Sequence, residues 1–224
     1  MPEVEIKRIG YGYDPKRWLF HDVSLTVNEG DAIVVTGRSG CGKSILLEIC
    51  AGLRKANAGE VLWNDTDLSG VLPNTMMEMR RRIGYVFQQH ALISNYTVYN
   101  NVALPLRYHF KLTERQVQER VYQQLRNFEV FELKDKLPEV LSAGQAKKAA
   151  LARALIMEPK MLFFDELTAG LDPDSTDTII SFLERIRREN KVSMLITSHS
   201  SYVALQMRCP FGVLKDGELL WNEW

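Results

Sequence analysis

The chain reads Gly37-Arg38-Ser39-Gly40-Cys41-Gly42-Lys43-Ser44 between an apolar run, residues 32–36, and a helical pattern that starts near Ile45. Glycines at these positions let successive backbone N–H groups curl around a polyphosphate, and the following helix directs its positive end at the anion. Lys43 can reach the β and γ oxygens, and Ser44 can hold a magnesium ion. The segment therefore predicts a phosphate-binding loop at a nucleotide site.

The composition predicts one globular unit that is large enough to bury a core. The chain has 224 residues, of which 46% are hydrophobic and 25% are charged. Because the formal net charge is zero, electrostatics gives no reason to expect a nucleic-acid partner. Cys41, Cys50 and Cys209 are widely spaced, which argues against a disulfide framework or a zinc site. No apolar run approaches the roughly 20 residues that span a bilayer, so any membrane part would belong to a partner.

Strand and helix patterns alternate along the chain, which predicts an α/β fold. Strand patterns fall at residues 3–13, 19–27, 32–36, 59–64, 83–87, 161–164 and 192–197. Helical patterns fall at residues 45–53, 113–128, 142–157 and 175–189. Near the end of the sequence, Asp216-Gly217 predicts a hairpin turn between residues 211–214 and 218–221.

Asp165 and Glu166 directly follow the apolar run at residues 161–164. Acidic residues at the carboxyl end of a buried strand project into the crevice where an α/β sheet binds its ligand. By position, Asp165 would coordinate magnesium through water, and Glu166 would be the general base for the attacking water. An Asp-Glu pair after a strand is common, so this interpretation depends on the phosphate-binding loop upstream.

Residues 141–145 read Leu-Ser-Ala-Gly-Gln at the start of the alanine-rich helical pattern. A helix N-terminus with a serine hydroxyl and bare N–H groups can receive an anion, although an ordinary N-cap gives the same pattern. Together with the phosphate-binding loop and Asp165-Glu166, this segment resembles the signature motif of ATP-binding cassette (ABC) ATPases. The resemblance extends over essentially the whole chain, residues 4–221.

The resemblance implies an α/β fold with a RecA-like P-loop ABC ATPase core, an N-terminal antiparallel β-subdomain and an inserted helical subdomain. It implies one ABC ATPase domain over residues 1–224. Residues 1–88 and 159–224 would form the nucleotide-binding core with the β-subdomain, and residues 89–158 the helical subdomain with the signature motif. ATP and Mg²⁺ would be the cofactors.

The same resemblance assigns roles to particular residues. The catalytic set would be Glu166, the switch histidine His199, Gln88 and Lys43. The metal set would be Ser44, Gln88 and Asp165, with Gln89 as a one-residue alternative to Gln88. The nucleotide-binding set would be Tyr13, Gly37, Arg38, Ser39, Gly40, Cys41, Gly42, Lys43, Ser44 and Ile45. Tyr13 is favoured for stacking on adenine, but Tyr11 shares its strand face by alternation, so periodicity leaves both open.

The remaining predicted roles lie across a dimer interface. Ser142, Ala143, Gly144 and Gln145 would face the γ-phosphate held by the other protomer, and Asp172 would be the polar member of a dimer-facing loop. Two positions depart from the family pattern. Ala143 replaces the first glycine of the signature and adds a methyl near the partner's nucleotide. Leu167 replaces a usual proline, so the loop after Glu166 gains backbone freedom and an N–H donor.

The resemblance implies a homodimer that closes on two ATP molecules and so moves whatever is docked on its helical subdomains. Residues 91–106 are apolar and aromatic beyond what a surface loop needs, and the resemblance places a permease's coupling helix there. We expect some of Leu92, Tyr96 and Tyr99 to be exposed to that partner. The protein would then be cytoplasmic and peripheral on the inner face of the cytoplasmic membrane.

Within the family, residues 101–107, 146–154 and 170–173 look most like the ATPases of MCE-type (Mla-like) lipid transport systems. This implies phospholipid transport with a permease and a periplasmic MCE lipid-binding protein. ABC ATPases for lipoprotein release or cell division share the pattern of residues 97–106 and are the alternative. Non-transport ABC ATPases would need a coiled-coil insertion or a second cassette. A scaffold that binds nucleotide without hydrolysis is opposed by Lys43, Glu166 and His199.

Overall fold

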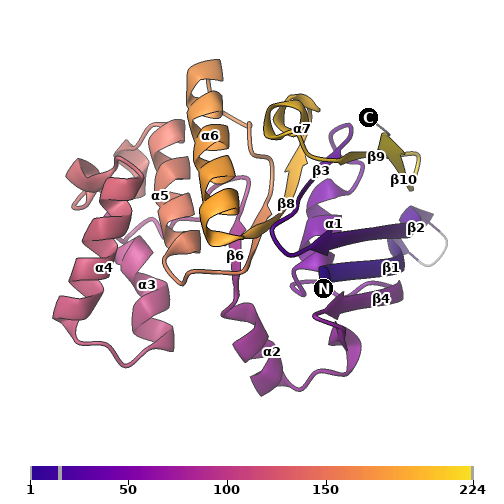
Figure 1. The fold of residues 1–224 in the computed structure, drawn as a ribbon, viewed down its shortest axis with the longest axis horizontal. Helices are drawn as coiled ribbons and strands as arrows, with labels where there is room; N and C mark the ends of the chain where they lie inside the picture. The colour runs from indigo at the N-terminus through magenta and orange to yellow at the C-terminus, as the bar shows by residue number, and fades with distance from the viewer. Residues whose placement is uncertain (1, 15–16, 223–224) are drawn as a thin grey trace.

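The structure, a computed structural model, describes residues 2–14 and 17–222. Within these residues the chain forms an antiparallel sheet of order β2-β1-β4-β5 and a mostly parallel sheet of order β10-β9-β3-β8-β7-β6 (Figure 1). The strands are β1 (Pro2–Asp14), β2 (Arg17–Asn28), β3 (Ala32–Thr36), β4 (Ala58–Trp63), β5 (Thr66–Asp67), β6 (Ile83–Val86), β7 (Met161–Phe164), β8 (Ser193–Ser198), β9 (Phe211–Lys215) and β10 (Glu218–Asn222).

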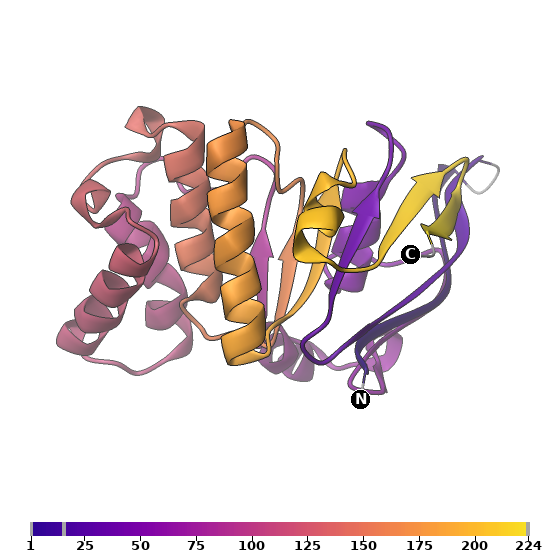
Figure 2. The same cartoon turned by 45° about the horizontal axis from the view of Figure 1, so that its top comes forward.

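Helices surround the parallel sheet. They are α1 (Lys43–Cys50), α2 (Pro73–Arg80), α3 (Val98–His109), α4 (Glu114–Asn127), α5 (Ala143–Leu155), α6 (Pro173–Asn190) and α7 (Tyr202–Met207). Short 3₁₀ turns are η1 (Leu68–Gly70), η2 (Phe131–Leu133) and η3 (Pro138–Val140). Figure 2 shows α5 and α6 side by side along one face of the sheet, with α3 and α4 beyond them.

Alternating residues of the parallel strands face two separate cores. Val34, Phe164 and Ile196 pack into the core beneath the helices of the 98–190 region. The adjacent residues on the same strands, Ile33, Phe163 and Leu195 among them, pack against α1 and the antiparallel sheet. Because both faces of β3, β7 and β8 are covered, these strands read as continuous apolar runs in the sequence.

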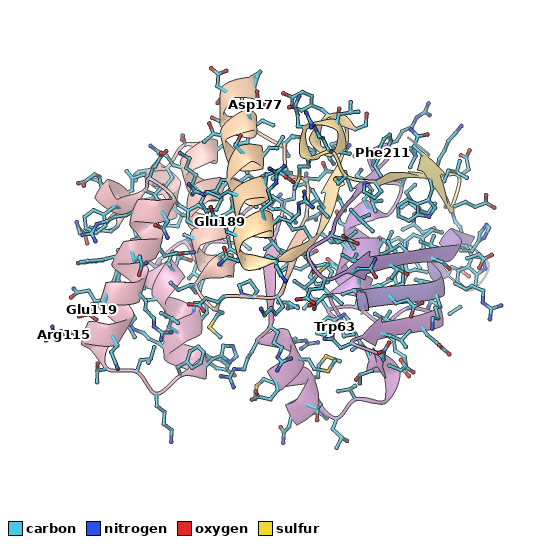
Figure 3. The ribbon with its side chains drawn as sticks, in the orientation of Figure 1. Trp63, Arg115, Glu119, Asp177, Glu189 and Phe211 are labelled. Atoms are coloured by element: carbon cyan, nitrogen blue, oxygen red, sulfur yellow. The ribbon has the colours of Figure 1, made fainter. Side chains whose placement is uncertain are left out.

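The antiparallel sheet covers the other side of α1. Inward residues of β2, such as Phe20 and Val23, are fully buried, whereas several of their neighbours along the strand face solvent. Trp63, labelled in Figure 3, lies at the end of β4, and its indole Nε1 donates to Cys50 O at 2.8 Å. This hydrogen bond fixes the end of β4 to the end of α1, so the second sheet supports the helix that follows the phosphate-binding loop.

The parallel order brings the ends of distant segments together at one edge. Thr36 at the end of β3 is in register with Ser198 at the end of β8, and Phe164 at the end of β7 is in register with Ile196. Residues that follow these strands are the phosphate-binding loop, Asp165-Glu166 and His199. The carboxyl edge of the sheet is therefore the place to look for a site.

The α/β architecture, the antiparallel sheet and the inserted helices agree with the sequence prediction, but three helices were missed. α2 has no buried residue and so carries little apolar periodicity. α3 contains Pro105, and its apolar residues were interpreted as a stripe that is partly core and partly partner-facing, without a helix being assigned. α7 is too short for a periodic pattern to stand out. The domain boundaries at 88/89 and 158/159 stay a prediction; the first follows β6, and the second falls shortly before β7.

Candidate active site

The phosphate-binding loop has a backbone that only glycine adopts comfortably. Gly37, Gly40 and Gly42 have φ angles of 153°, 78° and 107°. A Cβ at Gly37 would lie 2.6 Å from Leu214 O, and one at Gly42 would lie 2.9 Å from Phe20 Cδ1. The loop is thus packed between the β9–β10 hairpin and β2. It leads into α1, whose N-cap residue Gly42 supplies no side-chain cap, so the first N–H groups of the helix have no side-chain acceptor there.

Lys43 is buried and directed into this loop. Its Nζ donates to Gly37 O at 3.0 Å and to Arg38 O at 3.2 Å. The same Nζ forms an ion pair of 3.1 Å with Glu166 Oε1, and both side chains are only 4% exposed. A buried pair of this kind is stable only when its charges are well matched and hydrogen-bonded. The P-loop lysine and the carboxylate after β7 are therefore parts of one site.

Asp165 is held by two hydroxyls. Ser44 Oγ donates to Asp165 Oδ1 at 3.0 Å, and Thr197 Oγ1 on β8 donates to the same oxygen at 2.8 Å. Burial raises the pKa of Asp165, while the hydrogen bonds from Thr197 and Ser44 act in the opposite direction. Ser44 and Asp165 together present the hard oxygen donors that Mg²⁺ prefers.

Glu166 has one engaged and one unengaged carboxylate oxygen. Oε1 lies 3.1 Å from Lys43 Nζ and 3.3 Å from His199 Nε2, whereas Oε2 is buried without a hydrogen-bond partner among the described residues. Lys43 Nζ also lies 3.4 Å from His199 Nδ1. Because a carboxylate oxygen accepts, the contact at Glu166 Oε1 requires an Nε2–H donor on His199. An unpartnered buried carboxylate oxygen is costly, and it marks the position where a ligand or water would bind.

Some predicted site residues lie apart from this network. Gln88 and Gln89 are both exposed after β6, and among the described residues neither side chain forms a hydrogen bond with Ser44 or Asp165. Tyr13 is 77% exposed. Tyr11 is half-buried, and its hydroxyl accepts a hydrogen bond of 3.0 Å from Arg54. Since Tyr11 is engaged, Tyr13 has the freer ring, and its adenine-stacking role stays a prediction.

The signature segment is a closed capping box. Ser142 Oγ accepts from Gln145 N at 3.3 Å, and Gln145 Oε1 accepts from Ser142 N at 2.9 Å. The expectation of bare N–H groups at this helix start was therefore wrong for Gln145 and Ser142. The segment packs on the loop before α6: the nearest neighbours of a Cβ built at Gly144 are Ser175 Oγ and Leu171 Cδ2, 3.7 and 3.8 Å away. Asp172 itself caps α6 by accepting from Ser175 N at 2.8 Å.

The methyl of Ala143 and the side chain of Leu167 are both accommodated. A Cβ built at Gly170 would lie 3.7 Å from Ala143 Cβ, which is ordinary van der Waals contact. Leu167 is fully buried, and its N–H donates to Thr197 O at 3.2 Å. The additional donor expected at Leu167 is thus used, and it ties the loop to β8 where greater backbone freedom was expected.

Two residues of this region were missed from the sequence. Thr197 joins Asp165 to the backbone of Glu166, whose N–H donates to Thr197 Oγ1 at 2.9 Å. Lys147 is fully buried, and its Nζ donates to Glu166 O at 2.7 Å. Thr197 carried a signal, because it is a hydroxyl within an apolar buried strand. Spacing gives no such signal for Lys147, because Lys148 has equivalent apolar neighbours at i+3, i+4 and i+7.

The predicted partner-facing stripe is only partly open. Tyr96 is 37% exposed, while Leu92 and Tyr99 are partly buried and pack against the core. In residues 2–14 and 17–222, no helix combines the length and the apolar character needed to cross a bilayer.

Comparisons with known proteins agree with this geometry. Residues 20–169 match the family described as "ABC transporter", and residues 135–205 match an AAA domain family described as a putative AbiEii toxin. The chain is 33% identical over 217 residues to the methionine import ATP-binding protein MetN of Clostridioides difficile, covering 97% of this chain and 67% of that protein. It is 35% identical to a MetN 1 of Rhodopseudomonas palustris, covering 89% of this chain and 53% of that one.

Solved structures give the same result. A dimeric bacterial ABC transporter cassette, MJ0796, superposes with a TM-score of 0.89 at 29% identity, covering 96% of each chain. The cbiO1 protein of Clostridium perfringens, part of an ABC transporter complex, has a TM-score of 0.85 at 29% identity, covering 98% of this chain and 87% of that one. The chain spans about half to two-thirds of the length of the MetN relatives. It belongs to the ABC transporter family as an ATP-binding cassette with the ABC ATPase fold, and it is an ATPase.

Proposed function

We propose that the chain hydrolyses ATP at the site between α1, β7 and β8 and uses this reaction to drive a membrane permease. The observation that carries the proposal is the buried Lys43–Glu166 pair at the start of α1, in which Glu166 Oε2 has no hydrogen-bond partner within residues 2–14 and 17–222. A lysine that serves only the fold does not need a loop of glycines around it. A carboxylate oxygen with no protein partner is suited to accept a proton from water.

Each residue would have a distinct task. Backbone N–H groups of the phosphate-binding loop and the start of α1 would hold the phosphates, and Lys43 would turn from its carbonyl partners to the β and γ oxygens. Glu166 would orient the attacking water and take its proton through Oε2. His199, which already donates to Glu166 Oε1, would contact the γ-phosphate and keep the carboxylate in place.

Magnesium fits the oxygen donors at the site. Ser44 Oγ and Asp165 Oδ1 lie 3.0 Å apart, and Gln88 would complete the predicted set from its exposed loop. When bound, the ion would neutralise charge on the β- and γ-phosphate oxygens. Thr197 fixes the orientation of Asp165, so the donor pair is held before any ion arrives.

We propose further that two copies of the chain assemble around two ATP molecules. Support comes from the dimeric state of the MJ0796 cassette and from the exposure of Ser142 and Ala143 at the start of α5. Ser142 Oγ is an acceptor in its capping box, so its O–H remains available to donate to a phosphate. Such a dimer would have composite sites, with Lys43 from one copy and Ser142 from the other.

A mixing experiment tests the composite site. A Lys43→Ala chain and a Ser142→Arg chain should each be inactive alone. Mixed together they should regain part of the wild-type rate, because one site of each heterodimer keeps both intact halves. The wild-type rate should also rise more steeply than the protein concentration. If no mixing ratio restored activity, the composite site would be refuted, while single-chain hydrolysis could still be measured.

For the transported substrate, we propose a small solute of the methionine type. Support comes from the names of the MetN relatives, which align along nearly the whole chain. The sequence-based expectation of phospholipid transport with an MCE protein has no support among the reported relatives. A permease would dock near Tyr96, the exposed aromatic residue of the stripe at residues 91–106, and hold the ATPase at the cytoplasmic face of the membrane.

Reconstitution distinguishes these substrates. The chain should be purified from its native membrane with its permease and placed in vesicles that report either methionine uptake or transfer of a fluorescent phospholipid. We expect ATP-dependent methionine uptake that is lost in a complex carrying Glu166→Gln. Phospholipid transfer with the same dependence on Glu166 would contradict the solute proposal and favour the lipid one. Absence of any membrane partner would contradict the transport proposal itself.

A further inference from the structure

Lys147 lies in the second turn of α5 and is completely buried. Its Nζ donates to three backbone carbonyls of a single loop: Glu166 O at 2.7 Å, Leu167 O at 2.9 Å and Ala169 O at 3.4 Å. An ammonium group has three N–H donors, so all of them are directed at this loop. Burying the ammonium of a lysine costs desolvation free energy, and a position in the middle of a helix does not itself require a lysine. The position therefore calls for an explanation in terms of the loop.

The loop is the one that carries Glu166 from β7 toward α6. Glu166 has a φ of 54°, in the left-handed region that a residue with a Cβ enters only at a cost. Its N–H donates to Thr197 Oγ1 at 2.9 Å, and its carbonyl accepts from Lys147. Both backbone groups of Glu166 are thus held, from β8 on one side and from α5 on the other.

The carboxylate depends on this backbone. Because φ at Glu166 departs from the extended conformation of β7, the turn at this residue sets the direction in which the side chain leaves the strand. That direction brings Oε1 to Lys43 and His199 and leaves Oε2 without a hydrogen-bond partner in the part of the chain that the structure describes. A small rotation of the 166–169 backbone would move both oxygens away from these positions, and a 1 Å misplacement of a catalytic group can reduce a rate about 10²-fold.

Helix α5 begins at the signature segment, with Ser142 as its N-cap. A helix of this length moves as a rigid rod, so a displacement of the Ser142 end is transmitted along α5 to Lys147. We propose that Lys147 is a positioning residue for Glu166, connecting the signature end of α5 to the carboxylate in the same chain. The inference rests on the proposed role of Glu166 in hydrolysis. Lys147 acts through the backbone, because its three hydrogen bonds go to carbonyls of the 166–169 loop.

The experiment compares three substitutions. Lys147→Met removes the donors but keeps the length and volume of the side chain. Lys147→Gln keeps an N–H₂ donor without the charge. Lys148→Met is the matched control, because Lys148 is the next residue on α5 and its Nζ instead pairs with Glu129 at 2.8 Å on the surface.

Two readouts are expected to separate positioning from general stability. In Lys147→Met, kcat should fall about 10- to 100-fold while KM for ATP stays within about twofold, because the phosphate-binding loop does not contact Lys147. Lys147→Gln should recover part of kcat. Without nucleotide, amide hydrogen exchange at residues 167–170 should be at least about tenfold faster in Lys147→Met and unchanged in Lys148→Met.

Several outcomes would overturn the inference. These are a kcat for Lys147→Met within about twofold of wild type, equal losses in Lys147→Met and Lys148→Met, and unchanged exchange at residues 167–170. A Lys147→Gln chain as slow as Lys147→Met would also count against it. Wild-type and Glu166→Gln chains are measured alongside. If Glu166→Gln hydrolyses ATP at the wild-type rate, the proposed role of Glu166 fails; if only the Lys147 results are negative, the positioning inference fails alone.

Discussion

Helices α1 and α5 each bring a buried lysine to Glu166, but the two helix starts are built differently. Lys43 pairs with the Glu166 carboxylate, whereas Lys147 donates to its backbone carbonyl. The start of α1 has a glycine N-cap without a side-chain acceptor, while the start of α5 is closed by Ser142 and Gln145. The start of α1 can therefore bind an anion through its backbone N–H groups, whereas the start of α5 offers chiefly the O–H of Ser142 as a donor. The difference supports the proposal that α1 binds the nucleotide and that α5 contacts the nucleotide held by the partner.

The largest expected effect separates binding from chemistry at α1. Lys43→Ala should abolish tight ATP binding, because the phosphates lose their charged partner inside the loop. Glu166→Gln should bind ATP but hydrolyse it about 10²- to 10⁴-fold more slowly, the usual contribution of a positioned general base. Equilibrium binding of a fluorescent ATP analogue and single-turnover hydrolysis measure the two effects. A Glu166→Gln rate within a few-fold of wild type would show that another group activates the water.

The second prediction tests the buried Lys147 of α5 through the pH dependence of stability. Burial lowers the pKa of Lys147 from 10.5 to about 8, and Glu166 and Asp165 counteract this only in part. The unfolded chain regains the ordinary pKa, so between about pH 8 and pH 10.5 it binds a proton that the folded chain has lost. Stability from this group therefore rises with pH across that window. A pKa lowered from 10.5 to about 8 corresponds to a rise of about 3 kcal/mol in the free energy of unfolding across this pH window.

Urea denaturation of wild type, Lys147→Met and Lys148→Met at several pH values measures this effect. Relative to Lys147→Met, the wild type should gain stability from pH 7.5 to 10, because the other titrating groups are shared and cancel. The difference in unfolding free energy between wild type and Lys148→Met should change little from pH 7.5 to 10, since the Lys148–Glu129 pair lies at the surface. A wild-type advantage over Lys147→Met that does not vary with pH would contradict a buried, titrating Lys147.

Sequence reasoning placed the phosphate-binding loop and Asp165-Glu166 at one edge because each follows an apolar strand whose end the parallel sheet brings there, whereas His199 was assigned only from the family resemblance. It did not find Lys147, since composition and spacing leave open which alanine-flanked lysine of α5 turns inward. The capping box at Ser142 also escaped it, because the same residues serve a bare or a closed helix start. Tertiary packing decides both questions: Lys147 is buried while Lys148 reaches the surface.

A third prediction concerns the tyrosine of β1 that would stack on adenine. Tyr13 is exposed, while Tyr11 is engaged with Arg54 and packs against Phe20 at a ring distance of 6.2 Å. Tyr13→Ala should raise KM for ATP about 5- to 150-fold with little change in kcat, from the loss of about 1–3 kcal/mol of stacking. Tyr11→Phe, which removes only the hydroxyl bonded to Arg54, is the control and should leave KM within about twofold. A KM for Tyr13→Ala within about twofold of wild type would reject Tyr13 as the stacking residue, and equal effects of the two variants would show that the loss comes from a disturbed β1 strand and not from stacking.

The smallest expected effect is the loss of the Ser142 hydroxyl at the start of α5. The capping box at the start of α4 has matching geometry and serves as its control. At the start of α4, Gln116 N donates to Thr113 Oγ1 at 3.3 Å and Thr113 N donates to Gln116 Oε1 at 2.9 Å, the same distances as at Ser142 and Gln145. Ser142→Ala and Thr113→Ala should each reduce the free energy of unfolding by about 1 kcal/mol, since each loses one cap acceptor.

Only Ser142→Ala should also slow hydrolysis, by roughly tenfold, because its hydroxyl would donate to the partner's γ-phosphate and a hydrogen bond to a charged group contributes about 1.5–3 kcal/mol. Thermal unfolding and steady-state ATPase rates of the two variants decide the point. If Thr113→Ala slowed hydrolysis as much as Ser142→Ala, the loss would follow from a frayed helix. If Ser142→Ala lost stability but no activity, the Ser142 hydroxyl would be an N-cap and nothing more, and the contact of α5 with the nucleotide would have to come from its backbone.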